Sequence, residues 1–328
     1  MDPVTRKVHV RVPATSANLG SGFDTVGLAL DYHDELEFTL SSDPLNMAAQ
    51  VLIDGEGEDT LPRDESHLVV SAFRRACSRF GLSKTGFILE AHNNIPQARG
   101  MGSSAEAIVA GISAAYAFSH EGELDRDAIF ALAAELEGHP DNVAPAVYGG
   151  MTVSWTDEGA LQTLEHGVVT YAGYRTVNYI VDPTITTSVF IPDFELSTSK
   201  AREALPPLVP FKDAVFNVSR AALLIGAMNP GALTGAHDVN ALLMDATEDK
   251  LHQQYRGPLM QPSADLIAKL RLNGYAAMVS GAGPCVLVLH AGDAADMIDA
   301  VASAELASGH WRVLHLGVDT LGVQVARL

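Results

Sequence analysis

The sequence of 328 residues contains only two cysteines, Cys77 and Cys285. Two cysteines cannot make a disulfide framework, and their separation matches no zinc-binding spacing, so we interpret both as buried apolar residues. No stretch reaches the ~18 uninterrupted apolar residues of a membrane-spanning helix. The start of the chain lacks the apolar segment of a secretory signal. The sequence therefore predicts a cytoplasmic protein without a membrane anchor.

Basic residues are also few, with 21 Lys and Arg against 40 Asp and Glu and a formal net charge of −19. An acidic surface repels a phosphodiester backbone and an anionic leaflet, which argues against nucleic-acid and membrane binding. An anionic ligand must therefore find a local positive site. With 47% hydrophobic and 19% charged residues, the composition is typical of a well-packed globular protein rather than a disordered chain.

The length exceeds what one hydrophobic core usually fills, and it predicts two domains. We place their boundary near residue 165, so that residues 1–165 form the first domain and residues 166–328 the second. Strand and helix patterns follow one another without a steady βαβ rhythm, which favours an α+β fold. Strands are expected at 8–12, 34–40, 86–91, 176–181, 188–191 and 277–279, and helices at 68–80, 106–120, 124–136, 213–228 and 262–272.

The most informative segment is Pro96-Gln97-Ala98-Arg99-Gly100-Met101-Gly102-Ser103-Ser104-Ala105, between a predicted strand and a predicted helix. Its glycines let the backbone approach an anion, and the N–H groups and dipole of the helix start attract negative charge. It is not a Walker loop, because the chain has no Gly-Lys pair, and it lacks the third glycine of a dinucleotide fingerprint. A phosphate-binding loop and an ordinary turn with a serine cap explain the pattern equally well.

A second glycine turn, Ser280-Gly281-Ala282-Gly283-Pro284, lies between two apolar strands of the other half. Alone it is typical of a structural turn. Two such turns in separate halves of the chain indicate one nucleotide held between two lobes.

Three ordered segments, 13–24, 96–105 and 280–284, resemble the motifs of the galactokinase, homoserine kinase, mevalonate kinase and phosphomevalonate kinase (GHMP) superfamily. Within it, segments 16–24, 139–145, 197–206 and 249–256 are most similar to the homoserine kinases. The resemblance implies an N-terminal lobe like domain 2 of ribosomal protein S5 and a C-terminal ferredoxin-like lobe, with the C-terminal end of the chain returning to the first lobe. A homodimer is compatible with it.

The resemblance implies an ATP-dependent kinase that phosphorylates the side-chain hydroxyl of L-homoserine for threonine synthesis. It places the triphosphate on the loop from Pro96 to Glu106 and Mg²⁺ on Ser104 and Glu137. A serine hydroxyl one turn into such a helix is a suitable Mg²⁺ ligand. The resemblance places six residues around homoserine: Asn18, Asp24, His139, Asn142, Arg202 and Arg256.

The chemistry of homoserine agrees with these residues, because a zwitterion needs both a cation and a carboxylate. Arg202 and Arg256 supply guanidinium groups for its carboxylate, and Asp24 supplies a carboxylate for its ammonium group. We expect Asn18, His139 and Asn142 to orient the hydroxyl for in-line attack on the γ-phosphate, with Asn18 and Asn142 as the catalytic residues. Each residue alone also has a structural explanation, such as a solvated surface arginine or a helix cap at Asp24.

Phosphoryl transfer needs alignment and charge neutralisation more than a strong base. We therefore interpret Asp141 as structural and Asp24 as the weaker base candidate. Met101 stands where leucine is common and conserves its volume. Glu106 stands where a small residue is common, and it would either favour the helix dipole or repel the nucleotide. His67 is a further candidate for contact with the nucleotide.

Two other functions stay open. One is a GHMP kinase for another small alcohol, and the other is a catalytically silent ligand sensor on the same fold. The retained pair of Ser104 and Glu137 argues against the sensor, because a protein without turnover has little use for a complete metal site. Hydrolases are less supported, since neither a Gly-x-Ser-x-Gly nor a His-Glu-x-x-His motif occurs.

Overall fold

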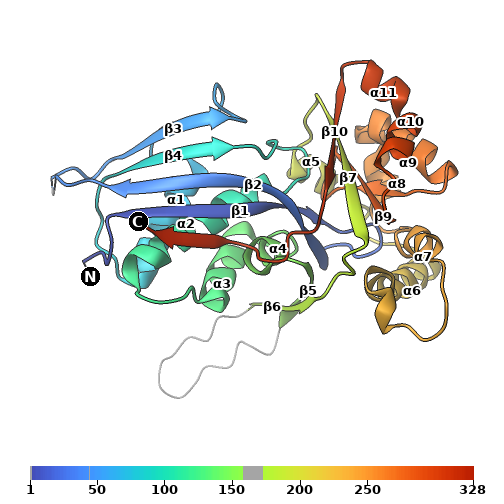
Figure 1. The fold of residues 1–328 in the computed structure, drawn as a ribbon, viewed down its shortest axis with the longest axis horizontal. Coiled ribbons are helices and arrows are strands. Elements are labelled where there is room, and N and C mark those ends of the chain that lie inside the picture. Colours follow the sequence, from blue (N-terminus) through green and yellow to red (C-terminus); the bar gives the residue numbers. More distant parts are fainter. Residues whose placement is uncertain (1, 44, 158–172) are drawn as a thin grey trace.

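The computed structural model describes residues 2–43, 45–157 and 173–328. The domain boundary predicted near residue 165 lies outside these residues. Two sheets with helices packed on them make up the described chain (Figure 1), as the α+β prediction requires.

The larger sheet has the strand order β11-β1-β2-β4-β3, and β5 and β6 extend it through a pairing of β5 with β2. All its pairs are antiparallel except the parallel pair of β3 and β4. Its strands are β1 (Lys7–Ala17), β2 (Val26–Leu40), β3 (Ala49–Gly55), β4 (Phe87–Asn93), β5 (Met151–Asp157), β6 (Gly173–Tyr179) and β11 (Gln324–Arg327).

Four helices of the described residues belong to this half, and Figure 1 shows α1, α2 and α3 on one side of the large sheet. They are α1 (Leu68–Phe80), α2 (Ser103–Ser119), α3 (Arg126–Glu137) and α4 (Val143–Tyr148). The alternating Val8, Val10 and Val12 of β1 face them and are fully buried. The alanine-rich α2 is buried almost all round, because it lies between β1 and the helices α1 and α3. The phosphate loop therefore leads into the most enclosed helix of this half.

The smaller sheet is antiparallel, with the order β10-β7-β9-β8. Its strands are β7 (Ile185–Pro192), β8 (Ala276–Val279), β9 (Val286–Ala291) and β10 (Trp311–Leu316). The helical elements of this half are α5 (Thr198–Glu203), α6 (Phe211–Met228), η2 (Pro230–Ala232), α7 (Val239–Ala246), α8 (Gln253–Arg256), η3 (Gly257–Leu259), α9 (Gln261–Leu272), α10 (Ala295–Val301) and α11 (Ser303–Ala307).

The chain returns to the larger sheet after the smaller one. Residues 324–327 of β11 pair with residues 8–11 of β1. Arg327 then donates to the carbonyl oxygens of Ala117 and His120 at the end of α2, at 2.9 and 2.7 Å. The two ends of the described chain therefore lie in one sheet (Figure 1).

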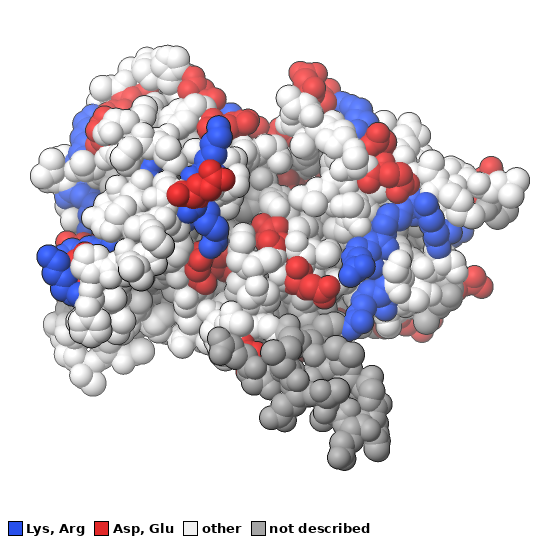
Figure 2. All heavy atoms as spheres, turned by 180° about the vertical axis from the view of Figure 1, so that it is seen from behind, with Lys and Arg blue, Asp and Glu red and all other residues white. Residues whose placement is uncertain are grey.

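Two properties of the surface follow from the structure. No helix among the described residues is long and apolar enough to cross a bilayer. On the face in Figure 2, uncharged residues cover most of the surface, and Lys and Arg stand in small groups beside Asp and Glu. This face therefore carries its charge in small separate groups and not as one extended patch of a single sign.

Candidate active site

A cavity of about 340 Å³ lies where the phosphate loop, the turn after β1 and the 280–284 turn meet. It gathers all six residues predicted to bind the substrate and both residues of the predicted metal pair. These eight residues are Asn18, Asp24, Ser104, Glu137, His139, Asn142, Arg202 and Arg256. Segments far apart in the sequence therefore converge on one site.

Two glycines allow the phosphate loop to fit between its neighbours. Gly100 and Gly102 have φ angles of +84° and +74°, which side chains rarely adopt. A Cβ atom at Gly100 would overlap the carbonyl oxygen of Ser280, and one at Gly102 would overlap Thr15 Oγ1. The loop therefore packs tightly between the segments 13–24 and 280–284. The backbone conformation of the loop requires glycine at both positions. Its cavity-lining members are Gln97, Ala98, Gly100, Gly102, Ser103 and Ser104.

The other five members of the predicted loop do not line the cavity: Pro96, Arg99, Met101, Ala105 and Glu106. Met101 and Ala105 are fully buried in the core. Arg99 turns to the second sheet, where its guanidinium group donates to the Pro192 carbonyl oxygen at 3.0 Å. These residues anchor the loop in the protein, while the residues that alternate with them in the sequence line the cavity.

Glu106 points away from the cavity, contrary to the prediction that its carboxylate lies near the triphosphate. It is 4% exposed and hydrogen-bonds to the side chain of buried Asp34. Asp34 Oδ1 also accepts the backbone N–H groups of Asn94 and Ile95, at 2.6 and 2.8 Å. Burial raises the pKa of Asp34 to about 6, and burial beside Asp34 raises the pKa of Glu106 well above its usual value.

The Glu106–Asp34 pair joins the two ends of the phosphate loop. Asn94 and Ile95 lie just before the loop, and Glu106 lies in the first turn of the helix that follows it. The hydrogen bond between the two side chains raises the pKa of Glu106 and lowers that of Asp34, so Glu106 is the member of the pair that donates, to the Asp34 carboxylate. A protonated Glu106 carries no charge, so it neither interacts with the helix dipole as an anion nor repels the nucleotide.

The two residues predicted to bind Mg²⁺ are in contact. Ser104 Oγ donates to Glu137 Oε2 at 2.7 Å, and both residues line the cavity. Burial raises the pKa of Glu137, while the hydrogen bond from Ser104 opposes that rise. A hydroxyl and a half-buried carboxylate are hard oxygen donors of the kind that Mg²⁺ prefers, so the residues present fit the ion.

Asp141 fixes the orientation of the two polar residues beside it. Its Oδ1 lies 2.9 Å from His139 Nδ1 and accepts the Asn142 backbone N–H at 3.0 Å. The hydrogen bond that His139 donates to Asp141 raises the pKa of His139. Asn142 Oδ1 accepts from Thr15 Oγ1 at 2.9 Å, and its Nδ2 makes no hydrogen bond to a described residue. Asn142 can therefore donate into the cavity.

Asp24 and Arg202, predicted to bind opposite ends of the substrate, bind each other instead. The Arg202 guanidinium makes two parallel hydrogen bonds to the Asp24 carboxylate, at 2.9 and 3.0 Å. Asn18 holds this end of the site, because its Oδ1 accepts the Asp24 backbone N–H and its Nδ2 donates to the Gly281 carbonyl oxygen. A zwitterionic ligand would have to break this pair, so that its anionic group binds Arg202 and its cationic group binds Asp24.

Arg256 is only 2% exposed, so its interpretation as a solvated surface residue is wrong. Its guanidinium group donates to the carbonyl oxygens of Ala201 at 3.2 Å and Gly281 at 3.3 Å, and it lies 5.2 Å from the centre of the Phe23 ring. Burial lowers its pKa. A buried guanidinium at the cavity wall strongly favours an anionic ligand.

Some cavity residues were missed by the sequence analysis. Leu68, Leu196 and Thr198 line the cavity, and the segment 197–206 had already been noted as similar to the homoserine kinases. Leu68 follows His67, which is 4% exposed and whose two ring nitrogens bond to no described residue. Leu68 was expected only as the first residue of the helix 68–80, and no pattern indicated that it or Leu196 lines a ligand site, because a single leucine has no chemical signature.

Family models match both halves of the chain. The description "GHMP kinases N terminal domain" matches residues 67–150, and "GHMP kinases C terminal" matches residues 229–307. The homoserine kinase of Leifsonia xyli is 44% identical over 324 residues, which cover 98% of this chain and 93% of that protein. That of Streptomyces coelicolor is 42% identical, over 98% of this chain and 95% of the other. The chain belongs to the homoserine kinases of the GHMP kinase family.

Solved structures of GHMP kinases show the same fold. A homoserine kinase from Cytophaga hutchinsonii superposes with a TM-score of 0.79 at 22% identity, over 99% of each chain. An L. major mevalonate kinase in complex with R-mevalonate superposes with a TM-score of 0.69 at 14% identity, over 98% of this chain and 99% of the other. The GHMP kinase fold expected from the three motifs is thus confirmed.

Proposed function

We propose that this GHMP kinase transfers the γ-phosphoryl group of ATP directly to the side-chain hydroxyl of L-homoserine. The product is O-phospho-L-homoserine, a precursor in threonine synthesis. One observation carries the proposal: a single cavity holds a phosphate loop, an oxygen-donor pair and two guanidinium groups, one of which is paired with the Asp24 carboxylate. Membership of the homoserine kinases supports the same reaction. The cytoplasmic location and the homodimer stay predictions.

The phosphate loop is well built to hold the triphosphate. Its glycines bring backbone N–H groups to the cavity, and α2 adds the positive end of its dipole behind Ser103 and Ser104. Ser104 and Glu137 would hold Mg²⁺, which supplies charge neutralisation to the transferring phosphoryl group. Because α2 is buried along its length, the loop needs little rearrangement as charge develops.

Asp24 and Arg202 would exchange partners when homoserine enters. The substrate carboxylate would replace Asp24 on Arg202 and approach Arg256, while the substrate ammonium group would take the Asp24 carboxylate. Each charged group keeps an opposite charge, so the exchange avoids leaving a desolvated ion unpaired. An uncharged alcohol would have to break the Asp24–Arg202 pair without replacing it, which gives the site a reason to prefer an amino acid.

The proposal includes catalysis by positioning, without a strong base. The Oδ1 atom of Asp141 is already engaged by His139 and the Asn142 backbone, so Asp141 acts as a positioning residue. Asn142 Nδ2 and Asn18 would orient the hydroxyl for in-line attack. The hydroxyl proton would leave with the phosphate or to water, which a loose transition state permits.

The proposal is tested by ADP release from ATP and Mg²⁺. L-homoserine is compared with no acceptor, L-serine, L-threonine, mevalonate and galactose. Release with L-homoserine alone is expected. Release with another acceptor would contradict the substrate, and no release from folded, ATP-binding protein would favour the silent sensor.

A matched pair of variants tests the substrate site. Arg202→Ala should raise the KM for homoserine by about 100-fold, since a charge-assisted bidentate contact contributes about 2–3 kcal/mol. Arg75→Ala, which removes an exposed arginine paired with Glu135 on the surface, should leave the KM unchanged. Equal effects of the two substitutions would refute the assignment.

A further inference from the structure

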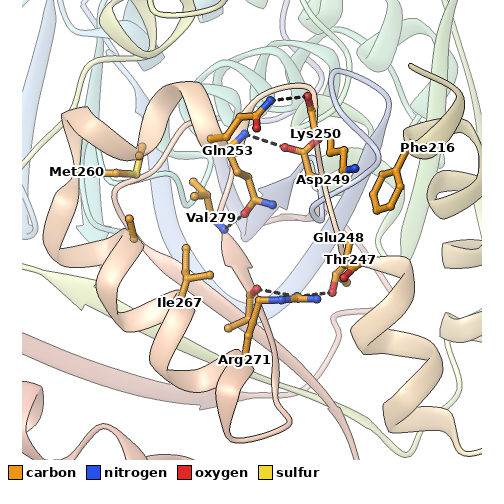
Figure 3. Close-up of a pocket in the computed structure, with 14 residues that line it drawn as sticks. Phe216, Thr247, Glu248, Asp249, Lys250, Gln253, Met260, Ile267, Arg271 and Val279 are labelled. Atoms are coloured by element: carbon orange, nitrogen blue, oxygen red, sulfur yellow. Dashed lines mark hydrogen bonds between the residues drawn. The ribbon is translucent and has the colours of Figure 1, made fainter. Parts of the chain in front are cut away.

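A second cavity of about 340 Å³ lies behind the wall of the first, between α6, α8, α9 and β8. Figure 3 shows Met260, Ile267 and Val279 along one side and Arg271 across the bottom. Phe216 closes the opposite side. None of the residues assigned to ATP, Mg²⁺ or homoserine lines it. The two cavities are therefore chemically distinct.

The acidic groups beside this second cavity are already used. Asp249 accepts the backbone N–H groups of Leu251, His252 and Gln253 at the start of α8. Glu248 accepts two hydrogen bonds from Arg220, at 3.2 and 3.3 Å. Both carboxylates therefore already have hydrogen-bond partners, Glu248 through its Oε2 atom alone.

The basic groups are less occupied. Arg271 donates only to uncharged oxygens, those of Met244, Ala277 and Thr247, and no carboxylate of the described chain lies within salt-bridge distance of it. The Lys250 ammonium lies 4.1 Å from the centre of the Phe216 ring, and its ion pair with Asp213 is long, at 3.9 Å. The charge left available to a ligand is therefore positive, beside an apolar wall.

We propose that this cavity binds a small organic carboxylate with an apolar body. The carboxylate would meet Arg271 and Lys250, and the body would contact Met260, Ile267 and Val279. The volume is near the lower end for small-molecule sites and suits a compact ligand.

The site is connected to the candidate active site through two contacts. Met260 lines the second cavity, and a Cβ atom at Gly283 would lie 2.6 Å from its Sδ, so Met260 packs directly on a residue of the first cavity. Gln253, which also lines the second cavity, starts the short helix α8 that ends at Arg256. A ligand that moves Met260 or Gln253 would change the homoserine site, a consequence that rests on the proposed function.

Benzoate and its neutral analogue benzamide are suitable probes. In protein labelled with ¹³C at the methionine methyl groups, benzoate should shift the Met260 signal, assigned from Met260→Leu, in a saturable manner. Benzamide should bind at least about tenfold more weakly, because it lacks the charge for Arg271 and Lys250. Ala264→Leu, which fills the cavity, should abolish the shift. Ala268→Leu, the same change at an exposed position of α9, should not.

Coupling is measured without turnover, as the Kd of benzoate with and without L-homoserine. Linkage is reciprocal, and a change of about fivefold or more is expected. No saturable shift, or a shift that survives Ala264→Leu, would overturn the site, and an unchanged Kd would overturn the coupling. Protein that binds benzoate but does not phosphorylate homoserine would contradict the proposed function and leave the second site standing.

Discussion

Replacing Glu106 by glutamine should change how the stability of the protein depends on pH. Glu106 is buried against Asp34, and its pKa is raised well above the ordinary value. A raised pKa means that the folded state keeps a proton that the unfolded chain has lost. The associated stability is fully present below the unfolded pKa and declines as pH rises through the folded pKa. The glutamine side chain would keep the shape and a hydrogen-bond donor to Asp34 but would carry no titratable proton.

The size of the effect follows from one proton. Above the Asp34 pKa of about 6, only Glu106 of the pair holds a proton in the folded state. Between the Asp34 pKa of about 6 and the raised pKa of Glu106, the unfolding free energy of the natural protein should therefore fall relative to Glu106→Gln by about 1.4 kcal/mol per pH unit. Titratable groups away from the Glu106–Asp34 pair are shared and cancel in the difference.

Urea unfolding at constant ionic strength across this range measures the difference. Glu121→Gln, at an exposed position, serves as the control and should give a curve parallel to that of the natural protein. A parallel curve for Glu106→Gln would mean that Glu106 is ionised in the folded state, and the interpretation of the pair as a protonated clamp would be wrong.

Three further predictions concern the candidate active site. Arg202→Lys should raise the KM for homoserine by about tenfold or more and change kcat little, since a lysine cannot make the bidentate contact, and steady-state kinetics checks this. Asp141→Asn should lower the pKa of His139, because the hydrogen bond that His139 donates to Asp141 is the main cause of its rise; an NMR titration of the ring that shows no decrease would contradict this cause. Gly102→Ala should weaken ATP binding by about tenfold or more, because the backbone there has a φ of +74°; calorimetric titration with ATP measures it, and unchanged affinity would argue against the loop geometry.

Local patterns predicted most of the elements close to the candidate site. The helix expected from Leu68 ends at Phe80 with Gly81 in the left-handed conformation, as a glycine stop signal indicates. Strand β1 was anticipated from its alternating valines, although it continues to Ala17. Strands β3 and β11 were not anticipated. Each has few residues with a strand signal, and each is stabilised by pairing with a distant segment that no local window contains.

The candidate site was predicted as a set of residues but not as a network. Motif resemblance indicated Asp24, Arg202 and Glu106, and chemistry suggested what isolated side chains of those types would bind. The pairing of Asp24 with Arg202, and of Glu106 with Asp34, depends on three-dimensional proximity between segments remote in the sequence. Sequence analysis therefore indicates what each side chain is able to bind, while the folded structure shows which side chains already bind one another.

The pairing of β11 with β1 has a consequence for synthesis of the protein. In chain order β1 precedes and β11 follows the other strands of the described residues, so this edge of β1 stays unpaired until β11 has been made. Domains of many proteins fold in order from the N-terminus as they emerge, but this sheet cannot close in that order. An unpaired strand edge can pair with another chain, so the nascent protein carries an aggregation hazard that its own last strand removes.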